Sequence, residues 1–90
     1  MRIVWRARAR TDMLMLVRYI SQDSPKGAAR VHEQILSMVG LLADWPDLGR
    51  QGRRRDLREL VVPRTPYIVL YRRTPAEVIV LRVVHGSQRR

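Results

Sequence analysis

The sequence predicts an α+β fold in one domain, residues 1–90, with the element order β-α-α-β-β-β. A chain of 90 residues has room for a single core. Apolar residues recur at helical spacing over about residues 12–44, and Ser24-Pro25 divides that stretch into two helices. Three stretches rich in β-branched and aromatic residues, each bounded by proline, fill the second half.

An N-terminal strand and a first helix are expected before the Ser24-Pro25 break. Apolar and polar side chains alternate over Ile3–Arg8, which predicts a strand. Thr11 or Asp12 offers a capping oxygen for a helix that runs to about Gln22. Its buried face is expected from side chains spaced i, i+3, i+4, i+7: Met13, Leu16, Val17 and Ile20.

The second helix has a strong start signal, a capping hydroxyl at Ser24 followed by Pro25 at the first helical position. It is expected to reach about Asp44, where Pro46 stops it. The short polar turn between the helices predicts an antiparallel helical hairpin. The buried stripe is expected to contain Ala28, Val31, Ile35, Met38, Val39 and Leu42.

An antiparallel three-stranded meander is expected in the second half, after a glycine- and arginine-rich loop at 47–56. Its strands are predicted at Leu57–Val62, Tyr67–Tyr71 and Val78–Val84. Strict alternation places Ile79, Leu81 and Val83 towards the helices and Val80, Arg82 and Val84 on the opposite face.

The charge balance is the first indication of function. Lys and Arg total 18 against 8 acidic residues, a net charge of +10, and every basic residue except Lys26 is arginine. Guanidinium forks pair with phosphates and carboxylates, so such a chain attracts nucleic acid or an acidic protein partner. The same charge also serves simply to keep a small protein in solution. The Arg53-Arg54-Arg55 run is open to both readings, electrostatic steering or a solvated turn.

Several classes of site are excluded. Without cysteine there is no disulfide, thiolate metal or thiol redox site. The two histidines, His32 and His85, lie too far apart in sequence to predict a metal site, and nothing indicates a cofactor. No apolar run approaches the roughly 20 residues that span a bilayer, and the N-terminus does not read as a signal peptide. We therefore expect a cytoplasmic protein without a membrane partner.

Six segments, in this order and spacing, resemble the RelE/ParE superfamily of small bacterial type II toxins. They are Asp12–Ile20, Ser24-Pro25, the turn Trp45–Arg50, the strands Arg58–Val62 and Pro66–Arg72, and the ending Val80–Gly86. The resemblance covers nearly the whole chain and implies the β-α-α-β-β-β fold. It also implies a cognate antitoxin with an acidic, partly disordered segment, hence a hetero-oligomer. We expect the antitoxin groove along the helical hairpin and the strand edges.

The superfamily has two activities, so the resemblance implies a choice between them. RelE-like toxins cut mRNA on the ribosome, using strand arginines and lysines with a C-terminal tyrosine, or a glutamate, arginine and histidine set. Here Ile68 replaces a strand arginine, and no tyrosine follows Tyr71. If the chain is a ribonuclease, its catalytic residues are expected to be Glu59, Arg82 and His85, with Arg89 nearby.

The favoured prediction is a ParE-like toxin that traps DNA gyrase on cleaved DNA and blocks replication and growth, with no catalysis of its own. Its target-binding residues are then expected to be Arg58, Arg72, Arg82, His85 and Arg89. The alternatives are the RelE-like ribosome-dependent mRNA endoribonuclease, and a basic nucleic-acid-binding or antitoxin-titrating protein without toxicity.

Purely structural roles, in hydrogen bonding, ion pairing or packing, remain open for several of these residues. His85 reads equally as a structural hydrogen-bonding group, and Glu59 as the ion-pair partner of Arg58 or Arg72. Trp5 and Trp45 are expected to be packing anchors. The three tyrosines, Tyr19, Tyr67 and Tyr71, are expected to pack with their hydroxyls in solvent.

Overall fold

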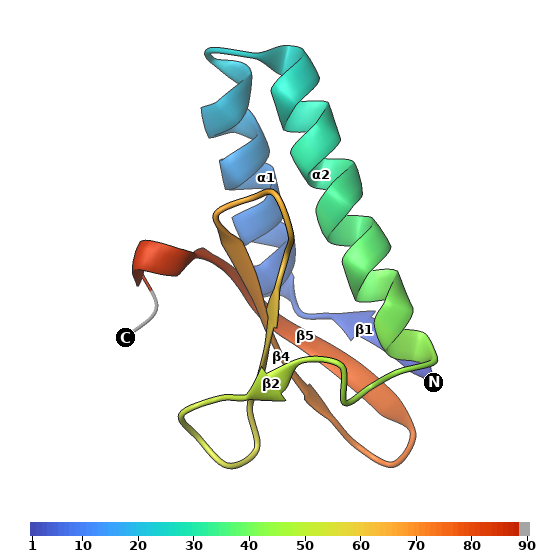
Figure 1. The fold of residues 1–90 in the computed structure, drawn as a ribbon. Helices are drawn as coiled ribbons and strands as arrows, with labels where there is room; N and C mark the ends of the chain where they lie inside the picture. The colour runs from blue at the N-terminus through green and yellow to red at the C-terminus, as the bar shows by residue number, and fades with distance from the viewer. Residues whose placement is uncertain (89–90) are drawn as a thin grey trace.

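The computed structural model describes residues 1–88, which form a helical hairpin packed on a mixed sheet (Figure 1). The predicted α+β class is confirmed, and the predicted order β-α-α-β-β-β is observed with one additional short strand, β2. The elements are β1 Arg2–Trp5, α1 Ala7–Ser21, α2 Pro25–Gly40, β2 Arg50–Gln51, β3 Arg58–Val61, β4 Tyr67–Arg73 and β5 Glu77–His85, with 3₁₀ turns at Leu41–Ala43 and Gly86–Gln88.

The described residues form a five-stranded sheet in the order β1-β5-β4-β3-β2. The expected meander, β3-β4-β5, is antiparallel throughout. It is extended on both sides, because β1 pairs in parallel with β5 and the short β2 pairs with β3. β2 lies inside the segment that was expected to be only a loop. The helical hairpin rises from the sheet, and its turn projects beyond it (Figure 1).

The first helix begins five or six residues earlier than the sequence predicted, depending on whether Thr11 or Asp12 is taken as the cap. β1 ends at Trp5, the Arg6 N–H donates to the Val80 carbonyl at 3.0 Å, and α1 starts at Ala7. The reason is the apolar spacing, since the fully buried Ala9 begins the core stripe that continues with Met13 and Leu16. Asp12 is therefore not a helix cap, and its carboxylate is available for another role.

The second helix begins as predicted. The Ser24 hydroxyl oxygen accepts from the Gly27 N–H at 2.9 Å, with Pro25 at the first helical position. The α-helix ends at Gly40 and continues as one 3₁₀ turn to Ala43. Most of the predicted stripe is fully buried, and the rest is half-buried, as Val31 and Met38 are.

The face assignment on β5 was wrong over part of the strand. Leu70 lies opposite Arg82 and Tyr71 opposite Val80, so Leu81 is an extra residue at a β-bulge. The alternation shifts by one position there. As a result the core contains Val78 and Val80 in place of the predicted Ile79 and Leu81, whereas Val83 is in the core as predicted.

The turn before β2 is fixed to the sheet by Tyr71, which is 0% exposed. Its hydroxyl accepts from the Gly49 N–H at 2.9 Å and donates to the Pro46 carbonyl at 2.7 Å. A Cβ at Gly49 would lie 2.7 Å from the Tyr71 ring, so only glycine fits. Two expectations fail here: the Tyr71 hydroxyl is not in solvent, and Trp45 is 59% exposed.

Candidate functional site

A groove of about 480 Å³ lies between α1 and the last third of β5. It forms where β1 stops pairing, at the Trp5–Val80 step, which leaves the remaining edge of β5 facing α1. Its lining combines one ion pair, a histidine, two tyrosines and apolar side chains: Asp12, Met15, Leu16, Tyr19, Tyr67, Arg82, Val83 and His85, with Ser87 and Gln88 at the rim.

Asp12 holds the β5 edge of the groove. Its Oδ2 accepts from Arg82 Nε at 2.7 Å and from the Val83 backbone N–H at 2.9 Å, and its Oδ1 accepts from Arg82 Nη2 at 3.1 Å. The carboxylate thus takes the place of a strand partner that β1 no longer provides. The paired geometry is the strong bidentate form of an arginine–carboxylate contact.

Arg82 keeps its charge in this arrangement. The Asp12 hydrogen bond raises the pKa of Arg82 above its already high usual value, and burial opposes that only in part. The Arg82 side chain is 37% exposed and lines the groove while Asp12 accepts from its Nε and Nη2. Arg82 therefore contributes a positive charge that is held in one position, and Asp12 occupies two of its five N–H donors.

His85 is held by the turn that follows it. The ring Nδ1 of His85 accepts from the Ser87 backbone N–H at 3.1 Å and lies 2.8 Å from the Ser87 hydroxyl. The backbone N–H of His85 donates to Gln88 Oε1. A backbone N–H can only donate, so Nδ1 is the acceptor nitrogen and Nε2 carries the proton of the neutral ring. His85 therefore presents a donor at Nε2.

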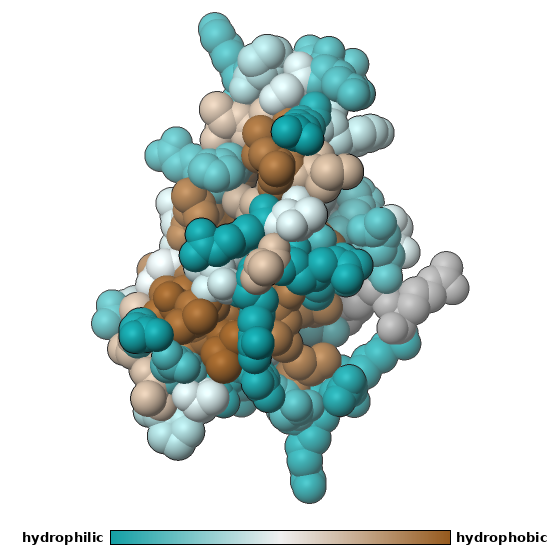
Figure 2. Space-filling model, turned by 180° about the vertical axis from the view of Figure 1, so that it is seen from behind, coloured by the Kyte–Doolittle hydropathy of each residue, from teal (hydrophilic) through white to brown (hydrophobic). Residues whose placement is uncertain are grey.

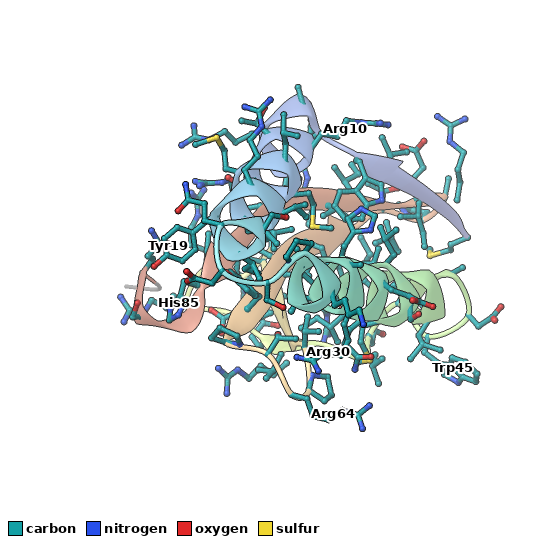
Figure 3. The ribbon with its side chains drawn as sticks, turned by 90° about the horizontal axis from the view of Figure 1, so that it is seen from above. Arg10, Tyr19, Arg30, Trp45, Arg64 and His85 are labelled. Carbon is teal, nitrogen blue, oxygen red and sulfur yellow. The ribbon has the colours of Figure 1, made fainter. Side chains whose placement is uncertain are left out.

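Two tyrosines complete the groove. Tyr67 meets His85 edge to face, with ring centroids 5.7 Å apart and an interplanar angle of 81°. Burial, and secondarily Tyr19, raises the pKa of Tyr67. Tyr19 is 71% exposed, and Figure 3 shows it on the same side of the molecule as His85, far from Trp45. An exposed tyrosine beside apolar Met15 is typical of a binding surface.

The family described as ParE toxin of type II toxin-antitoxin system, parDE, matches residues 3–90. The chain belongs to the ParE toxin family. It is thus a type II toxin of the RelE/ParE superfamily, and such a toxin implies a cognate antitoxin as its partner.

Three named relatives of this ParE-family chain are toxins, and two of them carry RelE names. It is 41% identical over 97% of its length to putative toxin Y4kP of Sinorhizobium fredii, covering 90% of that protein. It is 36% identical over 92% of its length to toxin RelE3 of Caulobacter vibrioides, covering 91%, and 34% identical over 96% to toxin RelE2 of the same organism, covering 96%.

The fold of the ParE-family chain matches a solved structure titled chromosomal ParDE TA system from P. aeruginosa. The TM-score is 0.85 and the match covers 94% of this chain and 95% of that one. At 23% sequence identity this likeness establishes the α+β architecture. Within residues 1–88 no helix is long and apolar enough to cross a membrane. No group of three potential metal ligands lies together in that range either.

The ParE-family chain does not bring the three proposed catalytic residues together. Glu59, Leu70 and Arg82 share one row across β3, β4 and β5, but the guanidinium of Arg82 turns to Asp12. Glu59 is buried and its Oε1 lies 3.2 Å from Arg50 Nε on β2, a partner the sequence analysis did not name. Of the three residues, only Arg82 and His85 line the groove.

The expected target-binding residues fall at two places. Arg82 and His85 lie in the groove, whereas Arg58 and Arg72 lie at the other end of the sheet. Arg89 lies outside the described residues. Along the antiparallel β4–β5 pair, His85 is opposite Tyr67, five residues before Arg72, or roughly 17 Å along β4. Arg82 is opposite Leu70, two residues before Arg72, or roughly 7 Å along β4, but its side chain turns away to Asp12.

Sequence reasoning missed two residues of the groove, Asp12 and Tyr19. Asp12, Met15 and Tyr19 follow one another at i, i+3 and i+7, which places them on one face of α1 beside the core stripe. That second stripe was a readable signal. The pairing of Asp12 with Arg82 could not be read from the sequence, because the two residues are 70 positions apart.

Proposed function

We propose that this ParE-family toxin inhibits DNA gyrase by binding it, through a surface that includes the α1–β5 groove. The proposal rests mainly on one observation: the arginine, the aspartate and the histidine of the groove are already engaged within the chain. Arg82 is paired with Asp12, and His85 Nδ1 accepts from Ser87. Such groups recognise a partner by shape and charge, and they do not have to change protonation to do so.

RNA cleavage makes different demands. It needs a base, an acid and cations that converge on one phosphate. Glu59, the carboxylate proposed for that set, is buried beside Arg50, outside the lining of the groove. His85 Nδ1 accepts from the Ser87 backbone N–H, so this nitrogen is not free to take a proton from RNA. These features support an interface in preference to a catalytic centre.

A second candidate is a ribosome-dependent mRNA endoribonuclease. It is favoured by the names of two relatives, toxins RelE3 and RelE2, at 36% and 34% identity. On this reading Arg82 and His85 contact the RNA, and Asp12 releases Arg82 when a phosphate competes for the guanidinium. The two functions are separable in a purified system.

We propose that the antitoxin binds along the helical hairpin. Two hollows between α1 and α2, of about 400 and 520 Å³, share Val17, His32 and Leu36 and so form one continuous groove. Leu14 and Leu36 are exposed along it. Seen from behind, apolar areas emerge between hydrophilic side chains over both the lower and the upper part of the molecule (Figure 2). An antitoxin helix with apolar side chains on one face and acidic ones at its border fits this surface and the net charge of +10.

The test is a cleavage assay with purified toxin, DNA gyrase and supercoiled plasmid. Linear DNA that appears after detergent and protease is the expected result for the parent chain. Tyr19→Ala and His85→Ala should each lower the yield of linear DNA roughly tenfold, because each removes a side chain from the centre of a partner surface. Trp45→Ala is the matched control, an exposed aromatic at the opposite end of the molecule (Figure 3).

Other outcomes would redirect the assignment. No linear DNA, together with mRNA cuts in a translating extract, would replace the gyrase proposal with the endoribonuclease. Linear DNA that is equally reduced by Trp45→Ala would remove the groove from the gyrase surface. A chain that does neither, and is harmless when induced in cells, belongs to the third class, an antitoxin-titrating protein without toxicity.

A further inference from the structure

A second concentration of charge lies at the end of the sheet opposite the groove. A hollow of about 310 Å³ opens there between β3, β4 and the 47–57 segment. Four arginines and two aspartates line it: Arg55, Arg58, Arg72, Arg73, Asp47 and Asp56. We call this the arginine pocket. Its formal charge is +4 from the arginines and −2 from the aspartates, a net +2 within a small space.

Two of the four guanidinium groups are held in place by one carboxylate. Asp47 Oδ1 lies 3.4 Å from Arg58 Nε, and Asp47 Oδ2 lies 3.0 Å from Arg73 Nη1. Arg58 also donates from Nη1 to the carbonyl of Gly49 at 2.7 Å. Asp47 is therefore shared between two cations, and it positions both without neutralising both. Prepositioned cations lose little side-chain entropy when an anion arrives.

Arg72 has an unused donor. Its Nε is buried and has no hydrogen-bond partner among the described residues. A buried N–H without an acceptor costs free energy, so such a group usually marks a missing acceptor. Arg72 also lines the pocket, so a small movement of its side chain towards a bound anion would give this N–H an acceptor.

The rim of the pocket is ordered as well. Gln51 donates from Nε2 to the carbonyl oxygens of Arg54 at 3.1 Å and Arg55 at 2.6 Å, and the Gly52 N–H donates to the Leu57 carbonyl at 2.8 Å. These bonds fix the loop that carries the Arg53-Arg54-Arg55 run. The run is therefore held beside the pocket, where its exposed guanidinium groups extend the positive surface outward.

We propose that the arginine pocket binds a backbone phosphate of duplex DNA, with Arg53-Arg54-Arg55 contacting its neighbours. Guanidinium forks pair bidentately with phosphate oxygens, and a hollow of this volume admits a phosphate group. An acidic protein helix would also need apolar positions to bury, and the pocket offers none among its lining residues, all of which are polar. The inference does not depend on gyrase, because the chain alone provides the site.

The test measures how the full chain binds a fluorescein-labelled, mixed-sequence DNA duplex of about 20 base pairs, by anisotropy over a range of salt concentrations. Arg72→Gln and Arg55→Gln should each weaken binding roughly tenfold. Each should also lower the slope of log K against log salt by about 0.9, the value of one phosphate contact. Arg30→Gln removes the same charge from the exposed surface of α2 and should change affinity less than about twofold (Figure 3).

Three results would overturn the proposal. Equal losses for Arg55→Gln and Arg30→Gln would mean that DNA responds only to the net charge of the chain. An unchanged salt slope in the pocket variants would mean that no phosphate contact was lost. If the pocket variants bound a labelled polyglutamate peptide more weakly than the parent chain but bound the duplex equally well, the pocket would be assigned to an acidic protein. Arg55 lies in an exposed loop, so its variant decides the matter even if Arg72→Gln fails to fold.

Discussion

Replacing Tyr71 with phenylalanine tests how the turn at 46–49 is attached to the sheet. The change removes one oxygen that accepts from the Gly49 N–H at 2.9 Å and donates to the Pro46 carbonyl at 2.7 Å. Gly49 is buried, so its N–H loses its acceptor, at a cost of roughly 1–3 kcal/mol. Pro46 is half-buried and its carbonyl reaches water more easily. We expect a total loss of about 2–3 kcal/mol.

Urea denaturation followed by circular dichroism measures the effect. With a slope near 1 kcal/mol/M for a chain this small, the midpoint should fall by about 2–3 M at an unchanged slope. Tyr19→Phe is the control, since Tyr19 is exposed, and it should change the free energy of unfolding by less than about 0.5 kcal/mol. If Tyr71→Phe matched that control, the turn would not depend on the hydroxyl and the reasoning would be refuted.

Alkaline pH gives the same hydroxyl a second test. Burial raises the pKa of Tyr71 above the usual 10.0, and the Gly49 hydrogen bond opposes this only in part. The unfolded chain therefore loses the tyrosine proton first. The contribution of Tyr71 to stability is fully present below about pH 10 and is lost as the pH rises from there through the folded pKa. Tyr71→Phe should flatten that decline, and a decline of unchanged steepness would contradict the assignment.

Three further changes have matched comparisons. Gly49→Ala should lower the free energy of unfolding by roughly 1–3 kcal/mol, because the new Cβ would lie 2.9 Å from the Glu59 carbonyl oxygen. Gly40→Ala should raise it by about 0.5–1 kcal/mol, because a Cβ there would meet no described atom within 4 Å. Thermal unfolding measures both changes. Asp12→Ala should cost about 2–3 kcal/mol in urea and Asp12→Asn less, since the amide oxygen still accepts from Val83; equal losses would contradict this. Arg64→Gly should raise the melting temperature relative to Arg64→Ala, because Arg64 has a φ of 63°.

Local patterns predicted most of the fold because most of it depends on local features. The Ser24-Pro25 start of α2 needs only a capping oxygen and a proline, and both are adjacent in sequence. The start of α1 was misplaced because Ala7 and Ala9 continue the alternation of β1 and also begin a helical stripe. Burial of Ala9 against the sheet decides between the two, and that is a tertiary contact.

The errors at the candidate sites have the same origin. The bulge at Leu81 depends on how β5 aligns with β4, which no alternation within one strand can indicate. Asp12 was read as a cap because its capping oxygen is a local property, whereas its contacts with Arg82 and Val83 join the two ends of the chain. In the same way, Tyr71 was read as a packing tyrosine because its partners lie in a turn 22 and 25 residues away.

The α1–β5 groove and the arginine pocket differ in how far aspartates balance their arginines. One pair of variants tests whether the two surfaces act separately. In the groove the carboxylate of Asp12 balances the charge of Arg82, so recognition there depends on the aromatic and apolar side chains around Tyr19 and His85. In the arginine pocket two aspartates face four arginines, so attraction for a polyanion remains. His85→Ala should therefore reduce gyrase poisoning while duplex binding and its salt slope stay unchanged. Arg55→Gln should weaken duplex binding and, at saturating DNA, leave the maximum yield of cleaved complex intact. If both variants lost both activities in the same proportion, the two surfaces would be a single site.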